Sequence, residues 1–143
     1  MVLGGKRHAE QADVRGLCDL HRSRAGGGGC VGAAPSGIKR TITARRDGPT
    51  EGYETVELII DLDPNVETGW IIHPGTEGGV ILEGGGELLI KGEPAVMSKL
   101  GTSWMLAAEA PHNLRNGPQA TKLALTLTVQ KGKPLTTPVP ART

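Results

Sequence analysis

Residues 69–84 read GWIIHPGTEGGVILEG, and residues 101–116 read GTSWMLAAEAPHNLRN. Both stretches hold short apolar runs interrupted by glycine and proline, a pattern typical of β-strands joined by turns. The first stretch contains His73 and Glu77, and the second contains His112. Two imidazoles and one carboxylate form a common set of metal ligands, so these stretches also hold the candidate functional residues.

The segments on either side show the alternation expected of β-strands. Residues 121–130 (TKLALTLTVQ) place three leucines and a valine on one side and polar or small residues on the other. This period of two is the signature of a half-buried strand. Residues 53–62 (YETVELIIDL) are β-branched and apolar, which also favours a strand. Further predicted strands cover residues 38–45, 66–72, 79–83, 87–91 and 103–107.

The composition favours one all-β domain. Many short strands separated by turns, with no strong helical pattern between them, point to a sandwich or barrel. A chain of 143 residues suits a single domain with a modest core. Because aromatic residues make up only 2% and phenylalanine is absent, that core must consist of valine, isoleucine, leucine and alanine.

The charge balance argues against two classes of partner. The net charge is +1, with 16 basic and 15 acidic residues, which gives no electrostatic reason to expect nucleic acid or an anionic membrane. Base stacking on an aromatic platform is also disfavoured by the few aromatic residues. No stretch of the sequence approaches the apolar length that spans a bilayer, so we do not expect an integral membrane protein.

The first 37 residues differ in character from the remainder. Residues 10–22 have only a thin apolar stripe, and a helix there would be marginal, whereas residues 26–29 are a glycine linker. We therefore expect a flexible N-terminal segment. It lacks the uninterrupted apolar region of a signal peptide, which predicts a cytoplasmic protein. The segment is compatible with a cytoplasmic tail, an alternative start or a misplaced gene start.

Both cysteines, Cys18 and Cys30, lie in this segment. A disulfide between them would close a small loop, and a zinc site could recruit His8 and His21. The spacing matches no zinc finger or ribbon, and two cysteines alone are weak evidence for a disulfide. We interpret them as free thiols.

The two quoted stretches resemble the paired signatures of the cupin superfamily. The first signature has a glycine ahead of a His-x-His pair, a glutamate after three further residues, and a glycine after six more. His73, Glu77 and Gly84 match it. The second signature has a glycine, five residues, Pro-x-Gly, two residues, a histidine, three residues and an asparagine. Gly101, His112 and Asn116 match it.

The chain departs from these signatures at three positions. Ile71 stands where the first histidine of the family is expected, and an isoleucine cannot bind a metal. Ala107 and Glu109 replace the proline and the second glycine. Because glycine tolerates backbone conformations that other residues avoid, we expect Glu109 to alter the turn before His112.

The resemblance and the strand geometry together predict a metal site. Alternation places residues 71 and 73 on the same face of a strand, and Glu77 can return to that face across the turn at residues 74–75. With His112 from a distant strand, the three side chains would form a facial triad with open positions. The expected metals are iron, manganese, nickel or zinc. The predicted pocket walls are Ile71, Trp104 and Met105.

We therefore predict an all-β fold, a small cupin-type barrel of the double-stranded β-helix or jelly-roll kind. It covers residues 38–133, and residues 134–143 form an extended C-terminal tail. We expect it to bind a small-molecule metabolite, with a divalent metal and an unassigned reaction. The alternative is a non-catalytic binding or interaction module with a degenerate metal site, which Ile71 favours. The resemblance also implies a homodimer formed by exchange of the strand at residues 38–46.

Overall fold

In the computed structural model of the chain, residues 36–141 are described. The predictions for the two cysteines, the marginal helix and the glycine linker lie outside these residues. The described residues contain strands and turns but no helix, as the turn-rich sequence predicts. Accordingly, none of them forms a helix that is long and apolar enough to cross a membrane.

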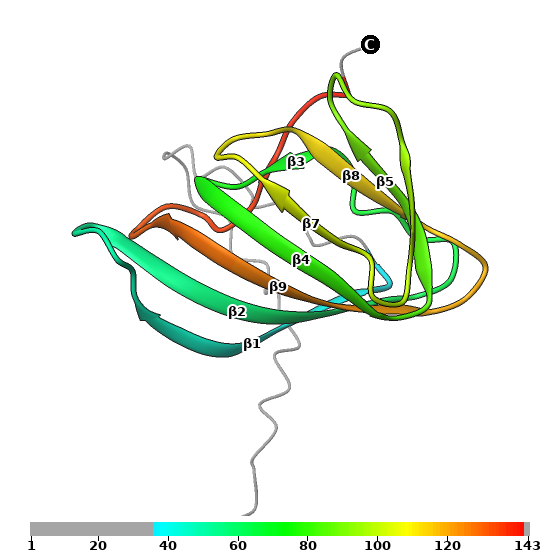
Figure 1. Cartoon of the computed structure of the whole chain (residues 1–143), viewed down its shortest axis with the longest axis horizontal. Coiled ribbons are helices and arrows are strands. Elements are labelled where there is room, and N and C mark those ends of the chain that lie inside the picture. Colours follow the sequence, from blue (N-terminus) through cyan, green and yellow to red (C-terminus); the bar gives the residue numbers. More distant parts are fainter. Residues whose placement is uncertain (1–35, 142–143) are drawn as a thin grey trace, which may run out of the picture. The chain divides into compact units, whose positions relative to one another are not determined.

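The described residues form ten strands in two antiparallel sheets of five strands (Figure 1). Sheet A has the order β1 (Ile38–Asp47), β2 (Tyr53–Leu62), β9 (Thr121–Gln130), β4 (Gly75–Glu83) and β7 (Ser103–Leu106). Sheet B has the order β10 (Thr137–Pro138), β3 (Ile71–Ile72), β8 (His112–Asn116), β5 (Gly85–Ile90) and β6 (Val96–Lys99).

The core lies between the two sheets and is aliphatic. Strands β2 and β9 pair over ten residues each, so their inward-facing side chains form two neighbouring rows on the same face of sheet A. The row on β9 is the one predicted from its alternation, and Leu123, Leu127 and Val129 are buried. Sheet B closes the core with Leu88 and Leu114. The fold is thus stabilised by burial of branched aliphatic side chains, as the composition requires.

The strand predictions are confirmed for β2 and β9, and the predicted segments 79–83, 87–91 and 103–107 overlap β4, β5 and β7. Residues 53–62 and 121–130 are strands with the predicted bounds. Of residues 66–72, only Ile71–Ile72 is a strand, and the preceding part is held by an isolated bridge between Glu67 and Arg115. Strands β6, β8 and β10 were not predicted, because none of them shows a clear alternation in the sequence.

Strand β1 lies at the edge of sheet A and is unusually open. It pairs with β2 along its whole length, yet nine of its ten residues are exposed. Ile42 is 48% exposed although it pairs with Leu58, which is 5% exposed and faces the core. The inward face of β1 therefore extends past the region that sheet B covers.

The predicted C-terminal tail contains a short strand that belongs to the barrel. Strand β10 pairs with β3 through Thr137–Ile72 and Pro138–Ile71. Figure 1 shows this last segment, in red, running beside β3. The barrel thus continues beyond residue 133 and includes residues that line its interior.

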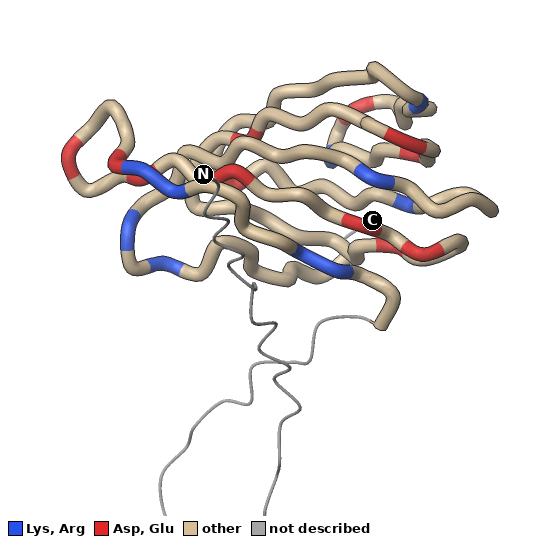
Figure 2. The backbone as a smooth tube through the Cα atoms, turned by 90° about the horizontal axis from the view of Figure 1, so that it is seen from below, with Lys and Arg blue, Asp and Glu red and all other residues tan. Residues whose placement is uncertain are grey.

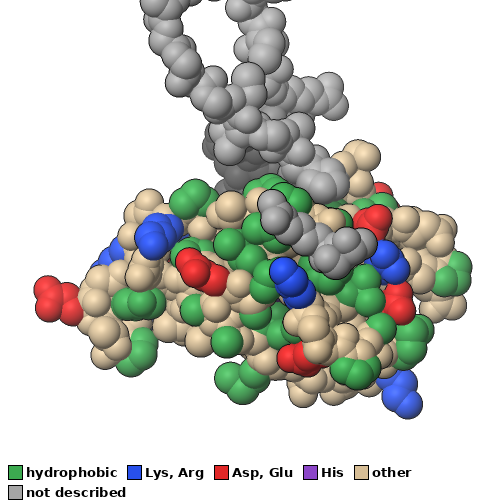
Figure 3. Space-filling model, turned by 90° about the horizontal axis from the view of Figure 1, so that it is seen from above, with side chains coloured by type: hydrophobic (Ala, Val, Ile, Leu, Met, Phe, Trp, Pro, Cys, Tyr) green, Lys and Arg blue, Asp and Glu red, His purple; other side chains and the backbone are tan. Residues whose placement is uncertain are grey.

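Surface charges are mixed rather than gathered. Basic and acidic residues are interspersed along the described strands and loops (Figure 2). On the face seen in Figure 3, hydrophobic side chains lie among separate charged ones. The arrangement agrees with the balanced composition, which gave no electrostatic reason to expect a nucleic-acid partner.

Candidate metal centre

His73 lies where the chain passes from sheet B to sheet A. It follows β3 and precedes β4, and Pro74 separates it from the first residue of β4. A side chain on that residue, Gly75, would collide with the carbonyl oxygen of Thr128 on β9. Glycine is therefore required for β4 to approach β9 so closely. The corner directs the His73 side chain into the space between the sheets.

Glu77 and His112 reach the same space from the two sheets. Glu77 is the third residue of β4 in sheet A, and His112 opens β8 in sheet B. All three side chains are buried, with relative exposures of 3–5%. Oε2 of Glu77 lies 2.7 Å from Nε2 of His73 and 3.5 Å from Nε2 of His112. The three ligand atoms fall within 4.8 Å of one another, as a shared metal ion requires.

Backbone carbonyls fix the orientation of both imidazoles. Nδ1 of His73 lies 2.6 Å from the carbonyl oxygen of Leu135, and Nδ1 of His112 lies 2.9 Å from that of Ala110. A carbonyl oxygen only accepts hydrogen bonds, so Nδ1 of each ring carries a proton and donates it. In the neutral rings both Nε2 atoms are then lone-pair acceptors directed at Glu77. Histidines that bind a metal through one ring nitrogen usually donate the N–H of the other to a carbonyl or carboxylate in this way.

The chemistry of these atoms fits a cation. Nε2 of His73 and Oε2 of Glu77 are buried and have no hydrogen-bond partner among the described residues. Two facing acceptors in an apolar interior are unfavourable unless a proton or a metal ion lies between them. The residues present therefore meet the requirements of a site with two nitrogen ligands and one oxygen ligand.

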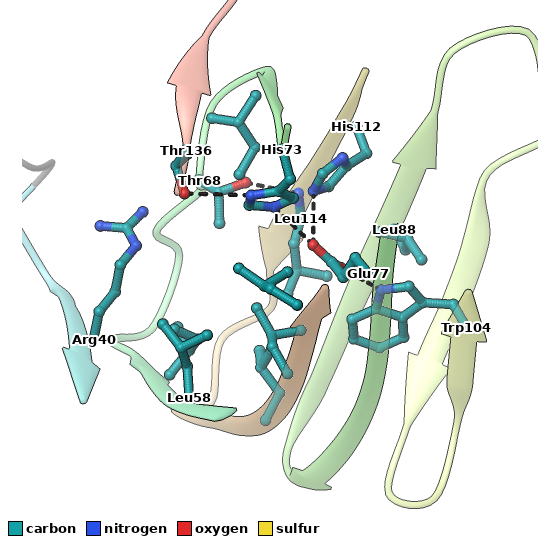
Figure 4. A pocket seen from close by; sticks show the side chains of 15 residues that line it. Arg40, Leu58, Thr68, His73, Glu77, Leu88, Trp104, His112, Leu114 and Thr136 are labelled. Atoms are coloured by element: carbon teal, nitrogen blue, oxygen red, sulfur yellow. Dashed lines mark hydrogen bonds and ion pairs between the residues drawn. The ribbon is translucent and has the colours of Figure 1, made fainter. Parts of the chain in front are cut away.

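Trp104 positions the carboxylate. Its indole Nε1 donates a hydrogen bond of 2.6 Å to Oε1 of Glu77, which leaves Oε2 directed at the two imidazoles (Figure 4). Trp104 pairs with Gly79 on β4, and any side chain at Gly79 would collide with the indole ring. Gly79 therefore makes room for the tryptophan that orients Glu77.

The metal-free site holds a buried ion pair. Burial alone would raise the pKa of Glu77, but the hydrogen bonds and charges of His112 and His73 outweigh burial and hold the pKa well below its usual value. For His112, burial lowers the pKa, but Glu77 and the carbonyl of Ala110 together raise it above its usual 6.5. A proton on His112 thus stabilises the carboxylate when no metal is bound.

Solved structures with the same architecture are found. An uncharacterised double-stranded β-helix protein from Klebsiella pneumoniae aligns with 73% of this chain and 86% of its own, at 13% identity and a TM-score of 0.59. A cupin-2 domain protein from Rhodospirillum rubrum aligns with 73% of this chain and 67% of its own, at 13% identity and a TM-score of 0.56. The chain has the cupin fold.

A third cupin neighbour has a named activity. It is the DMSP lyase of Ruegeria pomeroyi, which aligns with 59% of this chain at 20% identity and a TM-score of 0.54. The aligned region covers 43% of that lyase. No family model and no curated protein matches the chain. At these identities the likeness is one of fold, and the site must be judged on its own residues.

The residues at three of the cupin signature positions have a structural role in turns. Gly84 and Gly101 adopt φ of 71° and 81°, a backbone region that favours glycine. Asn116 lies at the far end of β8 from His112 and bonds the carbonyls of Asp63 and Gln119 at 2.7 and 2.9 Å. Asn116 therefore stabilises turns rather than contacting the metal site.

The turn before His112 contains a residue with positive φ. Glu109 adopts φ of 60°, the left-handed conformation that the glycine of the signature would favour. The turn is closed by a hydrogen bond of 3.2 Å from Ala110 N to Ala107 O. The amide of Glu109 also donates to the carbonyl of His73 at 3.0 Å. Glu109 is therefore a strained residue beside the site.

The three ligands border a cavity of about 50 Å³. Ile71 and Trp104 line it, as predicted, and Ile71 pairs with His112 across β3 and β8. The prediction for Met105 is wrong, since this residue is 85% exposed and lies on the outer face of sheet A. Neighbouring residues of a strand point to opposite faces, so Trp104 and Met105 could not both face the interior.

Sequence reasoning missed three contributors to this site. Arg40 on β1 and Thr136 before β10 line the cavity, and the carbonyl of Leu135 orients His73. The alternation of Ile38, Arg40 and Ile42 was a usable signal, because it places Arg40 on the apolar side of its strand. The tail gave no such signal, since it contributes through the Leu135 carbonyl and the single side chain of Thr136.

Proposed function

We propose that His73, Glu77 and His112 hold a divalent metal ion and that the chain uses it to bind a small oxygen-bearing metabolite inside the barrel. The observation that supports this most strongly is the contact of 2.7 Å between Nε2 of His73 and Oε2 of Glu77, two buried acceptors to which residues 36–141 give no hydrogen-bond partner. Iron, manganese, nickel and zinc all accept this ligand set.

The side chains around the site suit a metal-assisted reaction on a small molecule. A metal bound there would supply a Lewis acid that polarises an oxygen of the ligand. Three protein ligands leave positions open for that ligand. Leu88 and Leu114 border the cavity and keep bulk water away, which strengthens electrostatic interactions within it. The cavity of about 50 Å³ favours a ligand of few atoms.

The likeness to the DMSP lyase, a neighbour with a named activity, supports an enzymatic function. The alternative is a non-catalytic module that binds a small molecule without a metal. Ile71 favours this second function, because it removes one ligand of the usual cupin set. The two functions differ in one measurable property, the metal content.

Elemental analysis of protein purified without chelator tests the proposal. We expect close to one divalent ion per chain, recovered by iron, manganese, nickel or zinc after removal with a chelator. His112→Ala should abolish this binding, whereas His21→Ala, outside the triad, should leave it unchanged. Protein that holds no metal and takes up none of the four ions would overturn the metal-dependent function and leave the non-catalytic module. Metal content unchanged in His112→Ala would refute the site.

A further inference from the structure

Arg40 belongs to the inner face of the barrel mouth. It pairs with Ile60, whose side chain is buried in the core, so both residues point to the inside of sheet A. Arg40 lines the same cavity as the metal triad. Figure 4 shows its side chain extending from β1, with the guanidinium on the side where Thr136 and His73 lie.

Within the described part of the chain, this guanidinium has no acidic side chain beside it. Among residues 36–141, other arginines form ion pairs, Arg45 with Glu54 and Arg115 with Glu67, but none is found for Arg40. The described part of the chain also gives it no hydrogen bond. Partial burial lowers the pKa of Arg40, because desolvation disfavours the charged form. Arg40 is exposed at the mouth of the cavity, and no described residue neutralises its charge, so an anionic ligand can do so.

The cavity carries an excess of positive charge. Glu77 is the only acidic residue among its described lining residues, and the triad uses it. A divalent metal with one carboxylate and two neutral imidazoles has a charge of +1, and Arg40 adds another. The other walls are mostly aliphatic and include Leu58 and Ile60. The cavity therefore complements an anion with an apolar body.

We infer that the ligand is a small carboxylic acid whose carboxylate is bound by Arg40 at the cavity mouth. A guanidinium matches a carboxylate through two parallel hydrogen bonds, which a neutral amide cannot accept in the same way. The aliphatic walls contact the carbon chain, and another part of the molecule reaches the triad. This inference rests on the proposed function for the metal end, and it assigns the substrate class of the same site.

Ligand-observed NMR with butyrate and with butyramide, its neutral isostere, tests the inference. Both probes are titrated into the full chain, with and without zinc. We expect butyrate to bind at least about tenfold more tightly than butyramide, because hydrogen bonds to charged groups are the stronger ones. Arg40→Gln should abolish this preference, and Arg40→Lys should keep part of it. Arg46→Gln is the matched control, since Arg46 lies on the same strand and pairs with the outward Thr55.

The outcomes separate this inference from the metal proposal. A preference that is lost in Arg40→Gln, kept in Arg46→Gln and accompanied by unchanged metal content and melting temperature supports the role of Arg40. Equal binding of butyrate to the wild type and Arg40→Gln would overturn it. Equal binding of the two probes, or no binding of butyrate, would also overturn it. Metal content is measured separately. If the protein binds no metal but still prefers butyrate over butyramide through Arg40, only the metal proposal is refuted.

Discussion

At the scale of single residues, Ile71 determines how many ligands the site has. It lines the cavity and pairs with His112, so a histidine in its place would point at the other ligands. We expect Ile71→His to tighten zinc binding by about tenfold or more, since even outer-shell groups change metal affinity by that factor. Competition with a chromophoric chelator measures the affinity. Ile72→His, one residue along the same strand, should have no effect, and equal gains in both variants would contradict the geometry.

Glu109 allows a prediction about stability. Its φ of 60° costs roughly 1–2 kcal/mol for an L-residue. Glycine removes that strain but loses about 0.5–1 kcal/mol through the greater freedom of the unfolded chain. We therefore expect Glu109→Gly to stabilise the protein by about 0.5–1 kcal/mol. Urea unfolding tests this, with Glu109→Ala as a control that keeps the strain. Loss of stability in Glu109→Gly would contradict it.

The ion pair of the metal-free site predicts a dependence on pH. The raised pKa of His112 means that its contact with Glu77 stabilises the fold below pH 6.5 and is lost as the pH rises through the folded-state pKa. The lowered pKa of Glu77 means that its contribution is present above pH 4.5 and is lost only as the pH falls through its own folded-state pKa. The contact is therefore fully formed between these two values.

Metal binding must displace the proton of this pair, so its affinity should rise with pH. We expect the increase in melting temperature caused by zinc to grow between about pH 5 and pH 8, where histidine loses its proton. Calorimetric melting of metal-free and zinc-loaded protein at each pH measures this increase. An increase that is constant over this range would contradict the coupling between His112 and the metal.

At the scale of elements, the C-terminal strand supports the metal centre. Leu135 orients His73 through its carbonyl, and β10 holds this segment against β3. We expect deletion of residues 134–143 to weaken zinc binding by about tenfold, the usual effect of losing an outer-shell partner. Deletion of residues 141–143 leaves β10 in place and serves as the control. Equal zinc affinity in both truncated proteins would show that the tail does not position His73.

The exposed face of β1 is a candidate contact surface between two copies of the chain. Ile42 faces the inside of its sheet but remains 48% exposed, and edge strands are ready surfaces for pairing. We propose that a second copy of the chain covers this face, which gives a homodimer. Light scattering should show a dimer for the wild type and a monomer for Ile42→Asp, with Thr41→Asp as the outward-facing control. A monomeric wild type, or a dimer unaffected by Ile42→Asp, would contradict this.

Most strands could be predicted from the sequence, whereas the short strands β6, β8 and β10 could not. Ten residues of alternation identify β2 and β9, and their bounds are set by the flanking turns. Strands β3 and β10 have two residues each and owe their pairing to tertiary contacts. The same limit applies at the site. Spacing identified His73, Glu77 and His112, but the roles of the Leu135 carbonyl and Arg40 depend on how distant strands meet.

At the scale of the whole molecule, the two sheets bring together groups that are far apart in the sequence. His73 and His112 come from sheet B and its corner, Glu77 comes from sheet A, and Arg40 comes from the open edge. The result is an aliphatic interior with a small polar centre at one end (Figure 4). Such a barrel can hold one small ligand. The metal centre is the feature on which the proposed function depends.

An anomalous diffraction map of crystals grown from protein purified without chelator can locate that metal. Data collected above the absorption edges of iron, manganese, nickel and zinc would identify the element. We predict one peak at about 2.0–2.2 Å from Nε2 of His73, Nε2 of His112 and an oxygen of Glu77. A peak elsewhere, or no peak at the triad after each metal has been added, would contradict the proposed centre.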